Sequence, residues 1–90
     1  MAVQMLYFAW VRERLGFGEE SVDPPAGVAT VAALVDWLAA RDAVHAAAFA
    51  DRDRLRAAVD QAFVPLDSPI AGAREIALFP PVTGGDRRRR

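Results

Sequence analysis

One amphipathic helix, expected at residues 31–41 between short strand-like segments, constrains the fold of this chain most. Its branched apolar residues recur at the spacing of a single helix face: Val31, Leu34, Val35 and Leu38. Thr30 precedes them as a suitable N-cap, and Arg41 suits the negative end of the helix dipole. Ninety residues provide one core only. The pattern therefore predicts a single α+β roll in which one main helix covers one face of a sheet.

Short segments rich in branched and aromatic residues predict the strands of that sheet. They cover residues 3–10, 19–23, 55–59, 62–64 and 74–79. A helical turn at residues 11–15 follows the first strand, and the alanine-rich residues 43–50 predict a second short helix. Pro80 and Pro81 end the last strand, because proline has no N–H to donate to a sheet.

The first predicted strand is apolar on both faces, although a half-exposed strand alternates. Its second face carries Leu6, Phe8 and Trp10. One helix covers one face only, so Phe8, Trp10 and Phe79 would remain on the open face. Since soluble monomers rarely expose so large an apolar patch, we expect a protein-binding surface there. The alternative is that the helix at residues 43–50 folds over this face.

Charge and cysteine content limit the classes of function. The chain has no cysteine, which excludes disulfides, thiolate metal sites and a catalytic thiol. Apart from residues 86–90, seven arginines stand against eleven acidic residues. An acidic body argues against nucleic-acid binding and favours a protein partner that is basic around the contact. No apolar run reaches the ~20 residues of a membrane span, and residues 1–10 lack the positive charge of a secretory signal, so we expect no membrane contact and a cytoplasmic protein.

The polar side chains of the body form no catalytic or metal-binding pattern. His45, the only histidine, lies in the alanine-rich segment without an obvious partner, so a solvated or packed surface role is expected and not a catalytic one. Asp51, Asp53 and Asp60 do not have EF-hand spacing and are interpreted as a solvated connector and a turn. No metal site is expected.

The clearest chemical signal is Phe-Pro-Pro-Val-Thr-Gly-Gly at residues 79–85. Two prolines favour a stiff, extended exit from the last strand, and two glycines give a slender end that a narrow active site can admit. A free carboxylate on Gly85 could be activated as an acyl-adenylate and then passed to a sulfur or nitrogen nucleophile. Gly84 and Gly85 are therefore the candidate reactive residues.

With these motifs the sequence resembles the small subunits of molybdopterin synthase, a sulfur-carrier family also called molybdopterin-converting factor subunit 1. The matching motifs are Tyr-Phe-Ala at 7–9 with Val-Arg-Glu at 11–13, Ala-Val-Asp-Gln at 58–61, and the segment 79–85. The resemblance implies a ubiquitin-like β-grasp roll with a mixed sheet. It also implies a carrier domain at residues 1–80 and an extended arm at 81–85. Residues 86–90 would be a basic tail that is disordered or removed.

The resemblance further implies a role in molybdenum cofactor biosynthesis. Gly85 would be adenylated by an E1-like activating enzyme that uses ATP and magnesium, and a sulfur donor protein would convert it to a thiocarboxylate. The carrier would deliver this sulfur to cyclic pyranopterin monophosphate in the large subunit of the synthase, within a heterotetramer. The chain itself would bind no cofactor and would not be catalytic alone. The partner-binding residues would then be Phe79, Pro80, Pro81, Val82, Thr83, Phe8 and Trp10.

The residues after Gly85 depart from the family pattern. Asp86 and four arginines follow, so the Gly85 carboxyl is an amide until this tail is cleaved. The open alternatives are another ubiquitin-like sulfur carrier of the thiamine type, a protein modifier joined through Gly85 to a lysine, and a non-covalent regulator that keeps its tail. An RNA- or membrane-binding role for the arginines is opposed by the acidic body.

Overall fold

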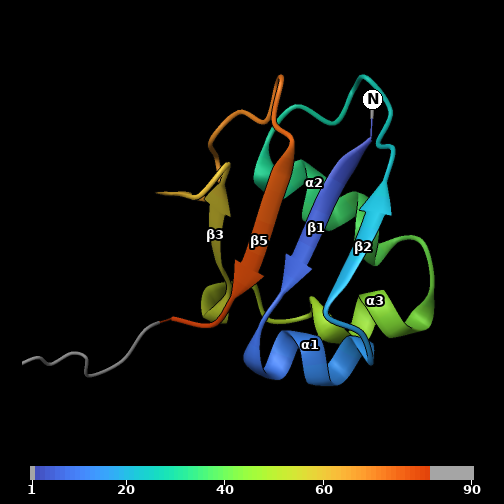
Figure 1. Ribbon diagram of the computed structural model, residues 1–90. Coiled ribbons are helices and arrows are strands. Elements are labelled where there is room, and N and C mark those ends of the chain that lie inside the picture. The colour runs from blue at the N-terminus through green and yellow to red at the C-terminus, as the bar shows by residue number, and fades with distance from the viewer. Residues whose placement is uncertain (1, 82–90) are drawn as a thin grey trace, which may run out of the picture.

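A five-stranded mixed sheet packs against helices in the computed structural model, which describes residues 2–81 (Figure 1). In chain order the elements are β1 (Val3–Tyr7), α1 (Ala9–Leu15), β2 (Glu19–Val22), α2 (Val31–Ala39), α3 (Ala43–Ala48), the 3-10 helix η1 (Arg52–Arg54), β3 (Arg56–Val59), β4 (Ala62–Val64) and β5 (Glu75–Phe79). The strand order is β2-β1-β5-β3-β4, with β1 and β5 parallel and the other pairs antiparallel. The predicted α+β roll with a mixed sheet is confirmed.

The strands bury one face of the sheet and leave the other open. Along β1, Val3, Met5 and Tyr7 are buried, whereas Gln4 and Leu6 are half-buried on the opposite side. Helix α2 lies behind the buried face, and α1 and α3 close its lower end (Figure 1). The four predicted apolar residues of α2 are all fully buried. The core therefore lies between the sheet and the helices.

Helix α2 begins where the sequence predicts and ends slightly earlier. The Oγ1 of Thr30 accepts a hydrogen bond from the backbone N–H of Ala33 at 3.1 Å, which confirms the N-cap. The last helical residue is Ala39, so Arg41 lies beyond the helix and is not in its last turn. Instead, the guanidinium of Arg41 is 3.8 Å from a carboxylate oxygen of Glu20 in β2.

Strand β1 is shorter than predicted and ends before Phe8. The N–H of Phe8 still bonds to the carbonyl of Leu78 in β5 at 3.2 Å, and Phe8 then serves as the N-cap of α1. The expected helical turn is thus a seven-residue helix that buries Val11 and Leu15 at helical spacing. Trp10 lies in this helix, so its predicted place on the open face of the first strand is wrong.

The second predicted helix exists, but it does not cover the open face. Helix α3 contacts α1 and α2, on the same side of the sheet as both. The alternative in which residues 43–50 fold over the open face is therefore wrong. Within residues 2–81, one face of the sheet has no helix over it, as expected for a binding surface.

Candidate functional site

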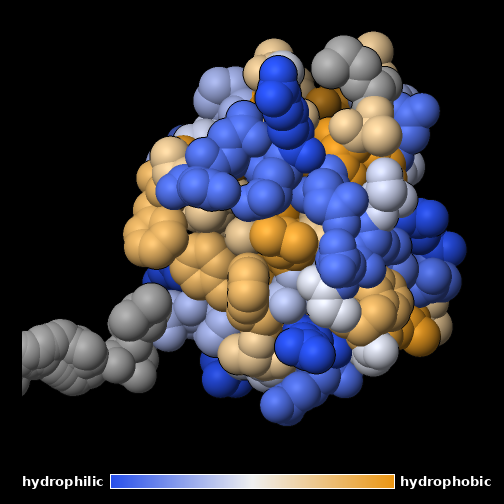
Figure 2. Space-filling model, viewed as in Figure 1, coloured by the Kyte–Doolittle hydropathy of each residue, from blue (hydrophilic) through white to orange (hydrophobic). Residues whose placement is uncertain are grey.

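Apolar side chains gather on the open face of the sheet, around the end of β5. Figure 2 shows this apolar surface over β3 and β5, close to the point where the chain leaves the sheet. We call it the open-face patch. It is a shallow hollow lined by Leu6, Phe8, Ala58, Phe63, Ala77 and Phe79, with Gln61 and Glu75 at its polar margin.

The register of four strands assembles the centre of the open-face patch. Leu6 of β1 pairs with Ala77 of β5, Ala77 with Ala58 of β3, and Ala58 with Phe63 of β4. Paired residues on neighbouring strands point to the same side of a sheet, so these four side chains form one row. The two alanines in the middle leave a shallow floor between Leu6 and Phe63.

Aromatic rings form the walls of the patch. The rings of Phe63 and Phe79 have centroids 5.5 Å apart and are tilted by 45°. Phe63 is 79% exposed and Phe8 is 49% exposed, which is unusual for side chains of this size. Exposed aromatic rings beside a hollow are typical anchors of protein–protein interfaces.

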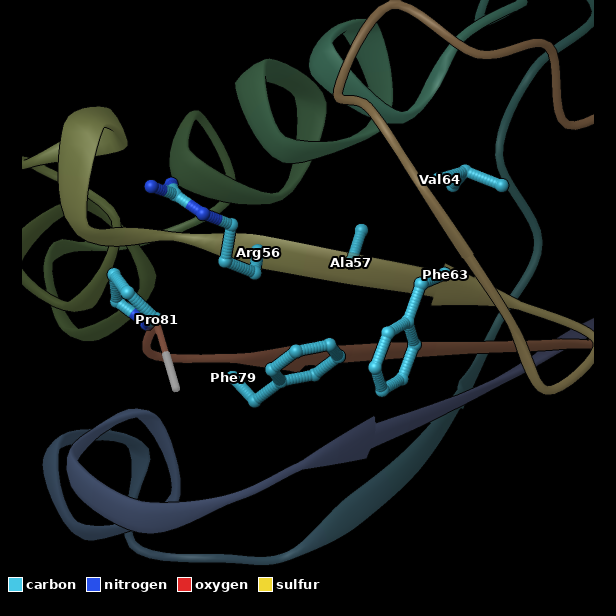
Figure 3. A pocket seen from close by; sticks show the side chains of 6 residues that line it. All are labelled: Arg56, Ala57, Phe63, Val64, Phe79 and Pro81. Carbon is cyan, nitrogen blue, oxygen red and sulfur yellow. The ribbon is translucent and has the colours of Figure 1, made fainter. Parts of the chain in front are cut away.

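The C-terminal arm starts directly beside this ring pair. Figure 3 shows a second hollow beside the Phe63–Phe79 ring pair. Pro81 and Arg56 also line this hollow. Pro80 and Pro81 are half-buried. A partner that binds the open-face patch would therefore also contact the first residues of the arm.

The structure brings together some of the predicted partner-binding residues. Phe8 and Phe79 lie on the open-face patch, and Pro80 and Pro81 follow it, whereas Trp10 lies outside it on α1. The remaining predicted site residues, Val82, Thr83, Gly84 and Gly85, lie outside the described residues, as does the tail at 86–90.

Sequence reasoning missed Phe63, the most exposed large apolar side chain of residues 2–81. The brief strand that carries it was predicted correctly, as β4 (Ala62–Val64). A strand of three residues has too short an alternation to show which face its aromatic ring takes. Pairing with Ala58 decides this, and that pairing depends on the turn at Asp60 and Gln61.

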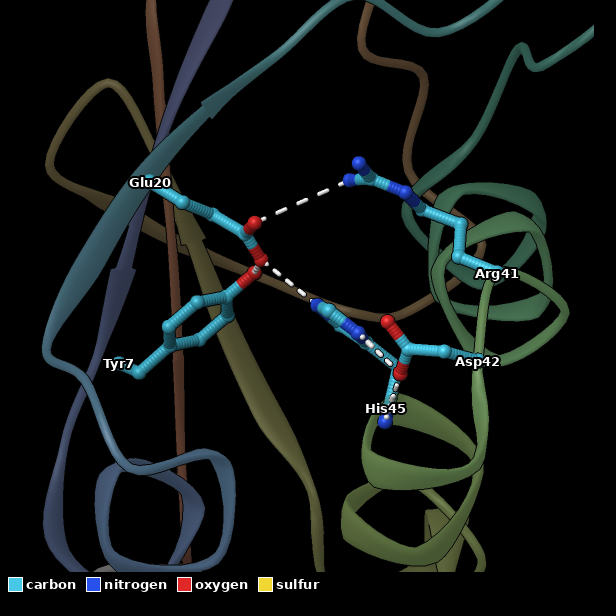
Figure 4. A network of polar contacts seen from close by, with 5 residues as sticks. All are labelled: Tyr7, Glu20, Arg41, Asp42 and His45. Atoms are coloured by element: carbon cyan, nitrogen blue, oxygen red, sulfur yellow. Dashed lines mark hydrogen bonds and ion pairs between the residues drawn. The ribbon is translucent and has the colours of Figure 1, made fainter.

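A partly buried polar network lies on the other side of the sheet, between β1, β2 and α3 (Figure 4). Nε2 of His45 is 2.8 Å from Glu20 Oε2, and Nδ1 is 2.8 Å from Asp42 Oδ1. The hydroxyl of Tyr7 donates to Glu20 Oε2 at 2.7 Å. Of the two roles expected for His45, the solvated one is wrong, because the side chain is packed in a buried position and contacts two carboxylates. These residues tie α3 to the sheet and do not touch the open-face patch.

This network shifts the pKa values of its members. Burial alone would lower the pKa of His45, but the hydrogen bonds and charges of Glu20 and Asp42 outweigh it, and the pKa is raised. The backbone N–H and the ring of His45 lower the pKa of Asp42. Burial and the bond to Glu20 raise the pKa of Tyr7. The two carboxylates therefore stabilise the charged form of the imidazole relative to the neutral form.

We predict that His45 makes the stability of the fold depend on pH. Its pKa in the folded state lies above its ordinary value of 6.5, so its contribution is complete below that value and is lost as pH rises through the folded pKa. Urea unfolding between about pH 6 and pH 8.5 should show the wild type losing stability relative to His45→Gln. Two proteins whose unfolding free energies change in parallel over this range would contradict the prediction.

Two further findings concern the described residues. None of the helices within residues 2–81 is long and apolar enough to cross a membrane. The same residues contain no group of three or more histidine or acidic side chains arranged to hold a metal ion.

Comparison with known proteins decides the family. The ThiS family model matches residues 5–85, which span the sheet and the diglycine. The chain belongs to the ThiS family. This ThiS-family chain is 41% identical over 83 residues to the molybdopterin synthase sulfur carrier subunit of Escherichia coli, a match that covers 92% of this chain and 99% of the relative.

Solved structures support the same family and fold. A molybdopterin converting factor subunit 1 from Pyrococcus furiosus superposes with a TM-score of 0.71 at 27% identity, over 91% of this chain and 99% of the other. The small archaeal modifier protein 1 of Haloferax volcanii gives a TM-score of 0.68 at 28% identity, over 90% and 98%. The expected ubiquitin-like β-grasp fold and the resemblance to molybdopterin synthase small subunits are confirmed.

Proposed function

We propose that this ThiS-family chain is a sulfur-carrier subunit of molybdopterin synthase and takes part in molybdenum cofactor biosynthesis. The observation that carries the proposal is the 41% identity to the Escherichia coli sulfur carrier subunit along nearly its whole length. The region matched by the family model includes Gly84 and Gly85. The carrier would act in the cytoplasm and bind no cofactor itself.

The proposed reactive group is the main-chain carboxyl of Gly85. A carboxylate oxygen attacks the α-phosphate of ATP on an E1-like activating enzyme, with magnesium, and pyrophosphate leaves. The terminal sulfur of a persulfide on a donor protein then attacks the Gly85 carbonyl carbon, and AMP leaves. A second thiol cleaves the resulting acyl disulfide, which releases the thiocarboxylate and leaves a disulfide between that thiol and the donor. The thiocarboxylate sulfur is an anion at neutral pH, so it needs positioning more than a base. This chemistry requires no cysteine in the carrier, in agreement with the sequence.

The bond between Gly85 and Asp86 must be hydrolysed before activation. As long as it is intact, Gly85 offers an amide and no free carboxylate oxygen. The proposal therefore includes a processing step that removes residues 86–90. Exposed glycine-rich segments are favourable sites for such proteolysis.

The open-face patch is the proposed docking surface for the large subunit. It combines exposed rings of Phe8 and Phe63 with a polar margin, as the centre and rim of a protein interface do. Because Phe79 belongs to the patch and the arm follows it, docking there directs the arm at the partner. The substrate-binding residues belong to that partner.

We predict that Phe63→Ala weakens binding to the large subunit without unfolding the carrier. An exposed ring contributes little to stability, whereas loss of a central aromatic anchor costs about 1–3 kcal/mol of binding free energy, or roughly 5- to 150-fold in affinity. Calorimetric titration would measure this. Val44→Ala is the matched control, because Val44 is also an exposed large apolar residue but lies on α3. Equal affinities of the Phe63 and Val44 variants would contradict the docking role.

We also predict that activation depends on a free Gly85 carboxylate. A chain ending at Gly85 should release pyrophosphate when mixed with the activating enzyme and ATP, and the 90-residue chain should not. Gly85→Ala in the shortened chain is the control for the slender tip, since its added Cβ hinders entry into the active site. Activation of the uncut 90-residue chain would contradict the processing step.

The similarity to small archaeal modifier protein 1 supports a second candidate, a protein modifier. In that role the activated Gly85 would be attacked by a lysine amine and form an isopeptide bond. Conjugates that survive a denaturing gel would support it, and their absence would favour the sulfur carrier. A thiamine-type carrier and a non-covalent regulator remain alternatives within the same fold.

A further inference from the structure

Three arginines come from elements at the end of the sheet where β5 ends (Figure 1): Arg14 of α1, Arg54 of η1 and Arg56 of β3, of which Arg56 lies beside Pro81. We propose that these residues, here called the arginine rim, form ion pairs with carboxylates on the protein that docks on the open-face patch. The inference rests on the proposed function in taking that protein to be the large subunit of molybdopterin synthase.

Trp10 holds two of the three arginines in place. The guanidinium carbon of Arg14 is 4.7 Å from the centroid of the Trp10 ring, and that of Arg54 is 5.8 Å away. Stacking on an aromatic ring uses the face of the guanidinium and leaves its N–H groups free for acceptors. Two cations from separate elements are thereby fixed close together before any partner arrives.

Arg56 joins the rim to the open-face patch. It pairs with Phe79 across β3 and β5, and it lines the same hollow as Phe63 and Pro81 (Figure 3). One of its nitrogens, Nη1, donates to the carbonyls of Asp53 and Leu55. Those bonds hold the side chain beside the arm without neutralising its charge.

The charges of the rim are unpaired within the described part of the chain. Arg41 and Arg52 each contact an acid, Glu20 and Asp36, but Arg14, Arg54 and Arg56 form no ion pair with any of residues 2–81. All three are exposed.

Unpaired arginines next to an apolar patch are complementary to a partner surface that carries carboxylates. The acidic composition of the body suggests a basic partner, but the placement of these charges indicates an acidic one at this edge.

The test is the salt dependence of binding to the large subunit from the same organism. We expect the double variant Arg14→Glu/Arg54→Glu to bind at least about tenfold more weakly at about 50 mM salt, and to lose most of the wild-type dependence on salt up to about 300 mM. Arg54→Lys, which keeps the charge, should retain most of that dependence.

Arg74→Glu is the matched control, because Arg74 is exposed and without an ion pair in the described chain but lies beside the Asp60 turn. Unchanged urea midpoints would show that each variant is folded.

Several results would overturn the inference. Wild-type affinity with a wild-type salt dependence in the double variant would show that the rim does not meet acids. A loss of affinity that is the same at about 50 mM and about 300 mM salt would assign the arginines a packing role. Salt-dependent binding of an RNA of about 20 nucleotides, abolished by the double variant, would assign the rim to nucleic acid. If the wild type itself does not bind the large subunit, the proposed function fails, and this inference falls with it.

Discussion

The parallel pairing of β1 with β5 is the contact on which the rest of the structure depends. These are the first and last strands of the described chain, and they lie side by side within the sheet. All other helices and strands lie between them in the sequence and pack around this pair. The pairing places Phe8 directly beside the end of β5, where the N–H of Phe8 bonds to Leu78. It thereby assembles the open-face patch next to Pro80 and Pro81. Contacts between such distant segments also make folding slower than local contacts do.

Local patterns in the sequence predicted the parts of the fold that depend on interactions between residues close together in the chain. The spacing of apolar residues and the Thr30 cap located α2, and the two prolines located the end of β5. Features that depend on distant partners were not predicted. Trp10 was placed on a strand because its apolar neighbours fit both periods. The contact of His45 with Glu20 was missed because the two residues are 25 positions apart, whereas Asp42, only three positions before His45, was overlooked. The motif at residues 79–85 carried the family assignment because its chemistry requires those residue types in that order.

The root of the arm combines two kinds of contact that act differently in binding. Apolar contacts at Phe63 and Phe79 would supply affinity, because they remove ring surface from water. Charges at Arg14, Arg54 and Arg56 would mainly accelerate and orient the encounter. A carrier must bind its partners in turn and then leave each of them, so moderate affinity with fast association suits the proposed role. The partly buried network around His45 lies on the other side of the sheet and serves the stability of the scaffold.

Intact-mass spectrometry of the protein, purified without a C-terminal tag from the cells that make it, tests the central claim most directly. The account predicts a species that ends at Gly85, with a fraction heavier by the difference between a sulfur and an oxygen atom. That result would establish both the removal of residues 86–90 and the thiocarboxylate. A population that extends wholly to Arg90, with no sulfur-containing form, would contradict the sulfur-carrier account.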